Sequence, residues 1–214
     1  ARPDGDEHVA RNEIRKAALR FIDANNPQNT GDPFFLYYAT QLPHGPVMVD
    51  NIGDMRKPEK VMQNTREWAA MIMKLDEFVG DLIADLKQKG LYENTIIFFA
   101  SDNGYSMCGY TTRGNGPDWP DDPWLKNKGP FTGGKFSVLE GGCRIPFFVS
   151  WPARYDAAVV SEPVWLCDFL PTAEALAGVE SDKPTDGVNL LPLLAGEPES
   201  FQGCDYLYFS KRRE

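Results

Sequence analysis

A carboxylate and a carboxamide directly follow a short apolar run near the middle of the chain. Residues 96–100 are all apolar, rich in β-branched and aromatic types, and too few for a buried helix, which predicts a strand buried on both faces. Asp102, Asn103 and Gly104 follow this run. Ligands of open α/β sheets bind beyond the carboxyl ends of the strands, and Ca²⁺ and Mg²⁺ prefer oxygen donors. We therefore interpret Asp102 and Asn103 as candidate metal ligands, although Asp-Asn-Gly is also a common turn sequence.

Two further loops present cationic side chains. His44 lies in a proline-rich loop after the apolar run 34–39, which predicts a second strand, and Lys135 follows two glycines. The prolines fix the backbone beside His44, and the glycines beside Lys135 indicate unusual backbone angles. A divalent cation together with a histidine and a lysine would neutralise an oxyanion substrate and its leaving oxygen. This chemistry fits a phosphate or sulfate ester.

The elements that position these residues alternate between helices and strands. Amphipathic helices are predicted over residues 7–24 and 58–89, the second with an apolar stripe of Trp68, Ile72, Leu75, Val79, Leu82 and Leu86, and with Gly90 just past its end. Further predicted elements are a strand over 147–151, a short helix from Asp168 to Leu176 that stops at Gly178, a short turn or helix over 190–194, and a strand over 206–209. This order favours an α/β fold with a mostly parallel, possibly mixed sheet.

Composition excludes several classes of function. The chain has 214 residues, enough for one domain with a real core, and a net charge of −9, which argues against a nucleic-acid partner. No apolar run approaches transmembrane length, and the first residues carry no secretory signal. The four cysteines have neither metal-ligand spacing nor the density of a disulfide framework.

Several motifs, taken in chain order, resemble the sulfatases of the alkaline-phosphatase superfamily. They are Pro43-His44-Gly45-Pro46, Leu75-Asp76, Ser101-Asp102-Asn103-Gly104, Gly134-Lys135 with Glu140-Gly141-Gly142, Arg144-Ile145-Pro146, Trp151-Pro152, Asp168-Phe169-Leu170-Pro171-Thr172 and Asp186-Gly187. The resemblance covers almost the whole chain. It implies an alkaline-phosphatase-like sheet flanked by helices, with residues 1–214 forming the central to C-terminal part of a sulfatase catalytic domain. The N-terminal half and a small C-terminal sheet are expected to lie outside this chain.

The resemblance also implies roles for the candidate residues. Asp102 and Asn103 would bind Ca²⁺, and Lys135 and His44 would contact the sulfate or its bridging oxygen. The family nucleophile is a cysteine or serine converted to formylglycine, with proline two residues on and arginine four residues on. Cys143 has Ile145 and Phe147 at those places, and Cys108, Cys167 and Cys204 also fail. We therefore expect the nucleophile upstream of this chain, and we expect the chain alone to be inactive.

Two alternatives to a sulfatase remain open. A phosphodiesterase or phosphonate hydrolase of the same superfamily would use the same metal with another nucleophile. A non-catalytic module for anionic glycans could stack sugars on Trp119 and Trp124 of the long loop 105–133. The expected partners are a sulfate ester of a glycan or aryl group and the missing N-terminal half. The resemblance to the sulfatases also favours a periplasmic, secreted or lysosomal protein.

Overall fold

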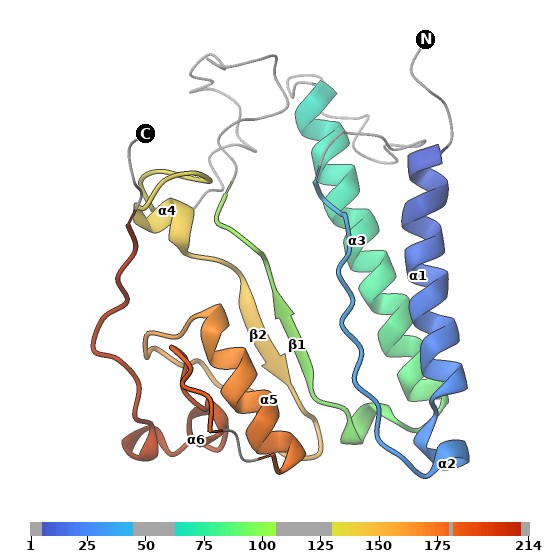
Figure 1. Cartoon of the computed structure of the whole chain (residues 1–214). Coiled ribbons are helices and arrows are strands. Elements are labelled where there is room, and N and C mark those ends of the chain that lie inside the picture. Colours follow the sequence, from blue (N-terminus) through green and yellow to red (C-terminus); the bar gives the residue numbers. More distant parts are fainter. Residues whose placement is uncertain (1–5, 45–62, 106–129, 180–181, 211–214) are drawn as a thin grey trace. The chain divides into compact units, whose positions relative to one another are not determined.

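A computed structural model describes residues 6–44, 63–105, 130–179 and 182–210 of the chain (Figure 1). It divides into two compact units. Unit 1 comprises residues 1–92 and 101–145, and unit 2 comprises residues 93–100 and 146–214. All four candidate residues, His44, Asp102, Asn103 and Lys135, belong to unit 1.

Two long helices form the frame of unit 1. α1 (Asp6–Ala24) and α3 (Gln63–Gln88) pack against each other and confirm the two amphipathic helices predicted from periodicity. α2 (Pro27–Thr30) follows α1 after an Asn26 cap. Arg15 of α1 forms an ion pair with Asp81 of α3, and its guanidinium lies 5.1 Å from the centre of the Phe78 ring. An ion pair and a cation–π contact therefore join the two helices.

The buried face of α3 contains most of the predicted stripe and two further residues. Leu86 is 5% exposed, and Trp68 and Leu75 pack against a buried cluster of Met71, Phe78 and Leu42, the last from the segment that follows α2. Met71 and Phe78, which the prediction omitted, are 0% and 2% exposed, whereas the predicted Ile72 is 37% exposed. Because the segment of Leu42 packs on α3, the buried face extends beyond the predicted stripe. Gly90 has φ +67° just past the end of α3, as expected for a helix-terminating glycine.

The predicted strand over residues 34–39 is an extended segment, and it pairs with no other strand within the described residues. Its side chains alternate in exposure: Phe35 and Tyr37 are exposed, and Phe34 packs edge-on against Phe21 of α1. The alternation has the period of a strand with one covered face. Residues 206–209 are likewise extended without a described strand partner.

Unit 2 contains the one strand pair of the described chain. β1 (Ile97–Ala100) and β2 (Phe147–Ser150) run antiparallel, with Ile97 opposite Ser150 and Ala100 opposite Phe147. Both predicted strands are confirmed, but the mostly parallel arrangement is not seen in this pair. The expectation that the first strand is buried on both faces is wrong, because β1 is only half-buried and Ala100 is exposed.

Short helices complete unit 2, and one of them packs on the strand pair. η4 (Leu166–Asp168) leads into α5 (Phe169–Ala177), and Phe169 makes an edge-to-face contact with Phe98 of β1 at 5.2 Å. Gly178, with φ +66°, ends α5 as predicted. α6 (Leu191–Leu194) and η5 (Pro198–Ser200) follow in unit 2, and η2 (Tyr92–Asn94) spans the boundary between the units before β1.

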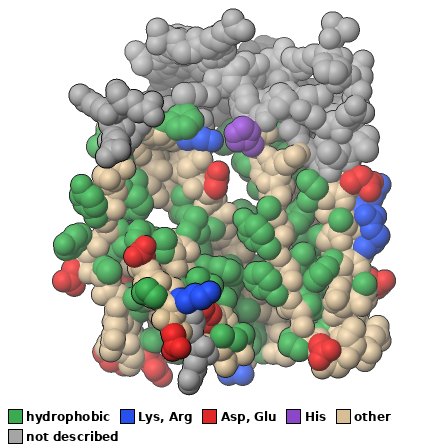
Figure 2. All heavy atoms as spheres, viewed as in Figure 1, with side chains coloured by type: hydrophobic (Ala, Val, Ile, Leu, Met, Phe, Trp, Pro, Cys, Tyr) green, Lys and Arg blue, Asp and Glu red, His purple; other side chains and the backbone are tan. Residues whose placement is uncertain are grey.

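Apolar side chains reach the surface in both units (Figure 2). None of the helices in the described ranges combines the length and the apolar character needed to cross a lipid bilayer.

Candidate active site

The candidate metal ligands lie in the turn that follows β1. Asp102 is exposed, and Asn103 is half-buried. The Ser101 hydroxyl donates to the Asn103 carbonyl at 2.9 Å, and the Asn103 side-chain amide nitrogen donates to the Gly104 carbonyl at 3.0 Å. Because its nitrogen is engaged in this bond, the oxygen end of the Asn103 amide is the end available to a ligand. The turn therefore offers a carboxylate and an amide oxygen.

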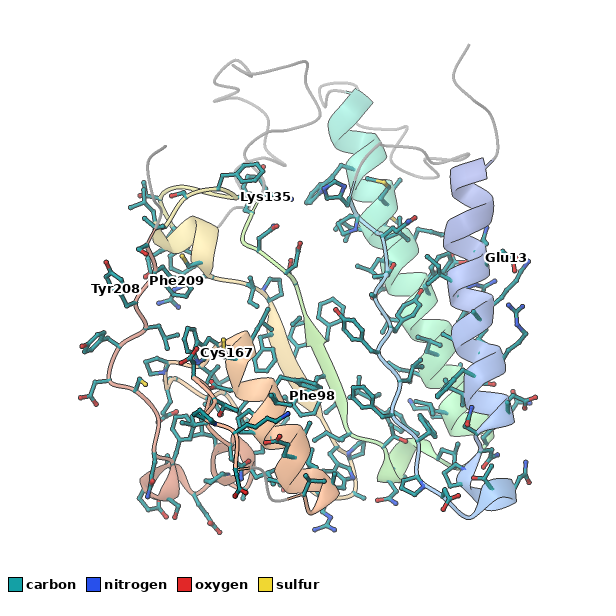
Figure 3. All side chains as sticks on the ribbon, in the orientation of Figure 1. Glu13, Phe98, Lys135, Cys167, Tyr208 and Phe209 are labelled. Carbon is teal, nitrogen blue, oxygen red and sulfur yellow. The ribbon has the colours of Figure 1, made fainter. Side chains whose placement is uncertain are left out.

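Lys135 lies in a loop that is hydrogen-bonded to this turn through backbone groups. The Lys135 N–H donates to the Tyr105 carbonyl at 2.6 Å, and the Gly104 N–H donates to the Gly142 carbonyl at 3.0 Å. These two bonds join the segment 102–105 to the start of the loop that precedes α4 (Glu140–Cys143), where Figure 3 marks Lys135, and to Gly142 within α4 itself. These hydrogen bonds therefore hold the turn of Asp102 and Asn103 against the loop of Lys135.

Glycines make this close approach possible. A Cβ at Gly104 would overlap the Gly141 carbonyl, and a Cβ at Gly142 would overlap the carbonyls of Ser137 and Gly134. Gly133 has φ +85°, which confirms the unusual backbone angle predicted beside Lys135 for this glycine but not for Gly134. Gly141 and Gly142 have a different role, since they admit neighbouring backbone rather than a left-handed angle. The sequence signal for that role was the Gly141-Gly142 pair itself.

These residues fit part of a calcium site rather than a whole one. Calcium takes roughly six to eight oxygen ligands, and this turn provides two side-chain donors. Among the described residues, no group of three or more His, Cys, Asp or Glu side chains is placed to hold a metal ion. Any calcium bound here would need further ligands from residues not described or from elsewhere in the protein.

His44 lies on a different segment of unit 1. Its backbone N–H donates to the Gln41 carbonyl at 2.8 Å, and its side chain is exposed. Two residues earlier, Leu42 is buried against Met71 and Phe78 and anchors the segment on α3. The structure therefore fixes the backbone beside His44, on a segment of the chain separate from the Lys135 loop. Trp119, Trp124 and Cys108 lie outside the described residues.

Cys143 does not have the character of a nucleophile. Cys143 is half-buried in α4, and burial, with a further contribution from the Glu140 carboxylate, raises the pKa of its thiol above 9.0. A raised pKa lowers the thiolate fraction and hence the reactivity. Cys167 and Cys204 are exposed free thiols of unit 2.

One serine has the proline and arginine spacing of the family nucleophile, and it was not among the residues considered from the sequence. Ser150 has Pro152 two residues on and Arg154 four residues on. However, Ser150 pairs with Ile97, the first residue of β1, whereas the metal-ligand turn follows the last residue, Ala100. Three residues of strand, about 10 Å, separate those two ends. Ser150 thus lies at the end of the strand pair remote from the turn, and its motif forms a structural bend in which Trp151 packs on Tyr155.

Comparison with known proteins identifies the family. The sulfatase family model matches residues 4–179. The chain is 32% identical over 180 residues to human N-acetylgalactosamine-6-sulfatase, an alignment that covers 83% of this chain and 31% of that protein. It is 33% identical over 197 residues to arylsulfatase A of Bos taurus, covering 92% of this chain and 35% of that protein.

This chain is also similar to a solved structure. The crystal structure of Ps i-CgsB in complex with k-i-k-neocarrahexaose superposes with a TM-score of 0.71 at 31% identity, covering 87% of this chain and 38% of that one. The chain thus spans about a third of the length of the relatives that it matches. The resemblance inferred from the sequence motifs is confirmed, and the chain belongs to the sulfatase family.

Proposed function

We propose that the protein containing this chain hydrolyses sulfate esters at a calcium site to which the chain contributes Asp102 and Asn103, with Lys135 and His44 acting on the sulfate. The observation that carries the proposal is the pair of backbone hydrogen bonds joining the turn of Asp102 and Asn103 to the loop of Lys135. Membership of the sulfatase family supports it. Because the chain spans about a third of its relatives, activity requires residues beyond these 214.

The cationic side chains have a defined task in this reaction. As the bond between sulfur and the leaving oxygen breaks, negative charge develops on that oxygen. A lysine ammonium beside it stabilises the transition state more than the ground state, and a histidine can donate a proton or a hydrogen bond to the same atom. Lys135 and His44 are the two candidates for these roles.

The metal and the nucleophile complete the proposed site. Bound calcium would act as a Lewis acid on the sulfate oxygens, with Asp102 and Asn103 among its ligands. The formylglycine nucleophile belongs, in this proposal, to a part of the protein that these 214 residues do not contain, since no cysteine here has the required spacing and Ser150 lies at the other end of the strand pair. The isolated chain is therefore expected to be inactive.

The relatives favour a glycan ester as the substrate. One is named as a sulfatase of N-acetylgalactosamine 6-sulfate, and Ps i-CgsB is in complex with a neocarrahexaose. We propose a sulfated glycan as the natural substrate, with aryl sulfates as convenient substitutes. The corresponding compartment is one reached by export: periplasmic, secreted or lysosomal.

Hydrolysis of an aryl sulfate series by the complete protein tests this function. Lys135→Ala and His44→Ala should each reduce turnover about a hundredfold or more, and most for esters with poorly acidic leaving alcohols. Lys74→Ala removes an exposed lysine of α3 that pairs with Glu77, and it should leave the rate unchanged. Unchanged rates in both site variants would overturn the assignment of these residues.

The two rival functions predict different results. A phosphodiesterase or phosphonate hydrolase would prefer phosphate diesters or phosphonates to sulfate esters of the same alcohol. A non-catalytic glycan-binding protein would turn over none of these esters, and Lys135→Ala would lower only its affinity for an anionic glycan. Either result would overturn the sulfatase proposal.

A further inference from the structure

Lys135 is followed by a residue whose backbone is unusual. Phe136 has φ +72°, and it is the one non-glycine residue with positive φ in the described parts of the chain. A large side chain in the left-handed region is strained, and such strain persists only where the surroundings impose it. The surroundings here are rigid, since the Lys135 N–H is bonded to Tyr105 and the Ser137 N–H donates to the Gly134 carbonyl at 2.9 Å.

The Phe136 side chain is equally unusual for a phenylalanine. It is 73% exposed, so burial does not explain why a strained position carries an aromatic residue. The Lys135 ammonium lies 5.5 Å from the centre of the Phe136 ring. At that distance the face of an aromatic ring attracts a cation. The strained backbone therefore coincides with a specific contact to the candidate catalytic lysine.

We propose that Phe136 is a positioning residue that holds the ammonium of Lys135 in place for the sulfate ester. The left-handed backbone turns the ring beside the lysine, and the ring restricts a flexible chain that has four rotatable bonds. An unrestrained ammonium would spend part of its time away from the leaving oxygen, and misplacement of a catalytic group is costly to rate. This inference rests on the proposed function of Lys135.

Two substitutions separate this role from a structural one. Phe136→Asn removes the ring, and asparagine tolerates left-handed angles, so the fold should be at least as stable as wild type. Phe136→Tyr keeps the ring and is the matched control. In the complete protein we expect Phe136→Asn to lower kcat for an aryl sulfate about fivefold or more with little change in KM, while the urea midpoint stays the same or rises. Phe136→Tyr should keep wild-type kcat.

The double variant gives the sharpest readout. If Phe136 acts through Lys135, then Phe136→Asn should have no further effect on kcat in the Lys135→Ala background. Additive losses, or full kcat in Phe136→Asn beside a large loss in Lys135→Ala, would overturn the positioning role and leave the proposed function intact. Absence of sulfate-ester hydrolysis by the wild-type complete protein would instead overturn the proposed function.

Discussion

Two aspartates at the ends of apolar stretches, Asp102 in unit 1 and Asp168 in unit 2, have opposite environments. Asp168 is 2% exposed, and its carboxylate oxygens accept the N–H groups of Trp165 at 2.9 Å and Val188 at 2.8 Å. Asp102 is exposed. A carboxylate with both oxygens bonded to the backbone serves the fold, whereas an exposed one beside a rigid turn is accessible to a ligand.

The two regions also differ in what holds them. In unit 2 the buried Thr172 hydroxyl donates to the Asp168 carbonyl at 2.6 Å and accepts the Leu190 N–H at 2.9 Å, so polar side chains join α5 to the segment 187–190. In unit 1 backbone bonds and close glycine packing join the turn to the Lys135 loop. Where side chains are needed for chemistry, the backbone provides the rigidity.

Asp168→Ala should have the largest effect on stability. It leaves two partly buried N–H groups without their carboxylate acceptor, at about 1–3 kcal/mol each, so we expect the free energy of unfolding to fall by about 3 kcal/mol. Asp102→Ala should change it by less than about 0.5 kcal/mol, as for most surface substitutions. Urea denaturation of the two variants measures the difference. Equal losses would remove the distinction between the two aspartates.

Gly142→Ala tests the glycine packing of unit 1. Its Cβ would overlap the carbonyls of Ser137 and Gly134, which are backbone atoms that cannot rotate away, and we expect a loss of about 2 kcal/mol in the free energy of unfolding. Gly80→Ala is the matched control, because a Cβ there meets nothing within 4 Å and the position lies inside α3. It should stabilise the protein by up to about 1 kcal/mol. If both variants were equally stable, the loop would be looser than the structure indicates.

Local features of the fold were predictable from the sequence, and long-range ones were not. The periodicity of α1 and α3, the two strands and the terminating glycines Gly90 and Gly178 are set by neighbours along the chain. The burial of Met71 and Phe78 on α3 was not predictable, because it depends on Leu42, which is remote in sequence from both residues. The antiparallel pairing of β1 with β2 likewise has no signature within either strand.

In the candidate site, too, local features were predictable from the sequence and long-range contacts were not. The residue types at Asp102, Asn103 and Lys135 indicated the chemistry, but the bond from Gly104 to Gly142 joins segments distant in sequence and leaves no periodic pattern. Phe136 contradicts the local rule that glycine or asparagine occupies left-handed positions, so sequence reasoning passed over it. Ser150, Pro152 and Arg154 have the spacing of the family nucleophile motif. However, Ser150 pairs with the first residue of β1, whereas the metal-ligand turn follows the last one.

The smallest predicted effect concerns Cys143. Burial raises the pKa of its thiol, so the folded state retains the proton at a pH where the unfolded state loses it. This contribution to the stability of the fold is fully present below the unfolded pKa of 9.0, and it is lost as the pH rises through the higher folded pKa.

The raised pKa and the partial burial of Cys143 also lower its reactivity. At pH 8.5 iodoacetamide should modify Cys143 more slowly than the exposed Cys167 and Cys204, as peptide mass spectrometry can resolve. Faster modification of Cys143 would contradict its assigned environment.

Calorimetric titration of the complete protein with Ca²⁺ tests the central contrast most directly. If Asp102 is a calcium ligand, as proposed, Asp102→Ala should weaken calcium binding about tenfold or more, because it removes a carboxylate donor, with no change in the urea midpoint measured without calcium. Asp168→Asn, which keeps one oxygen acceptor, should lower the urea midpoint and bind calcium with wild-type affinity. Wild-type calcium affinity in Asp102→Ala would contradict the account.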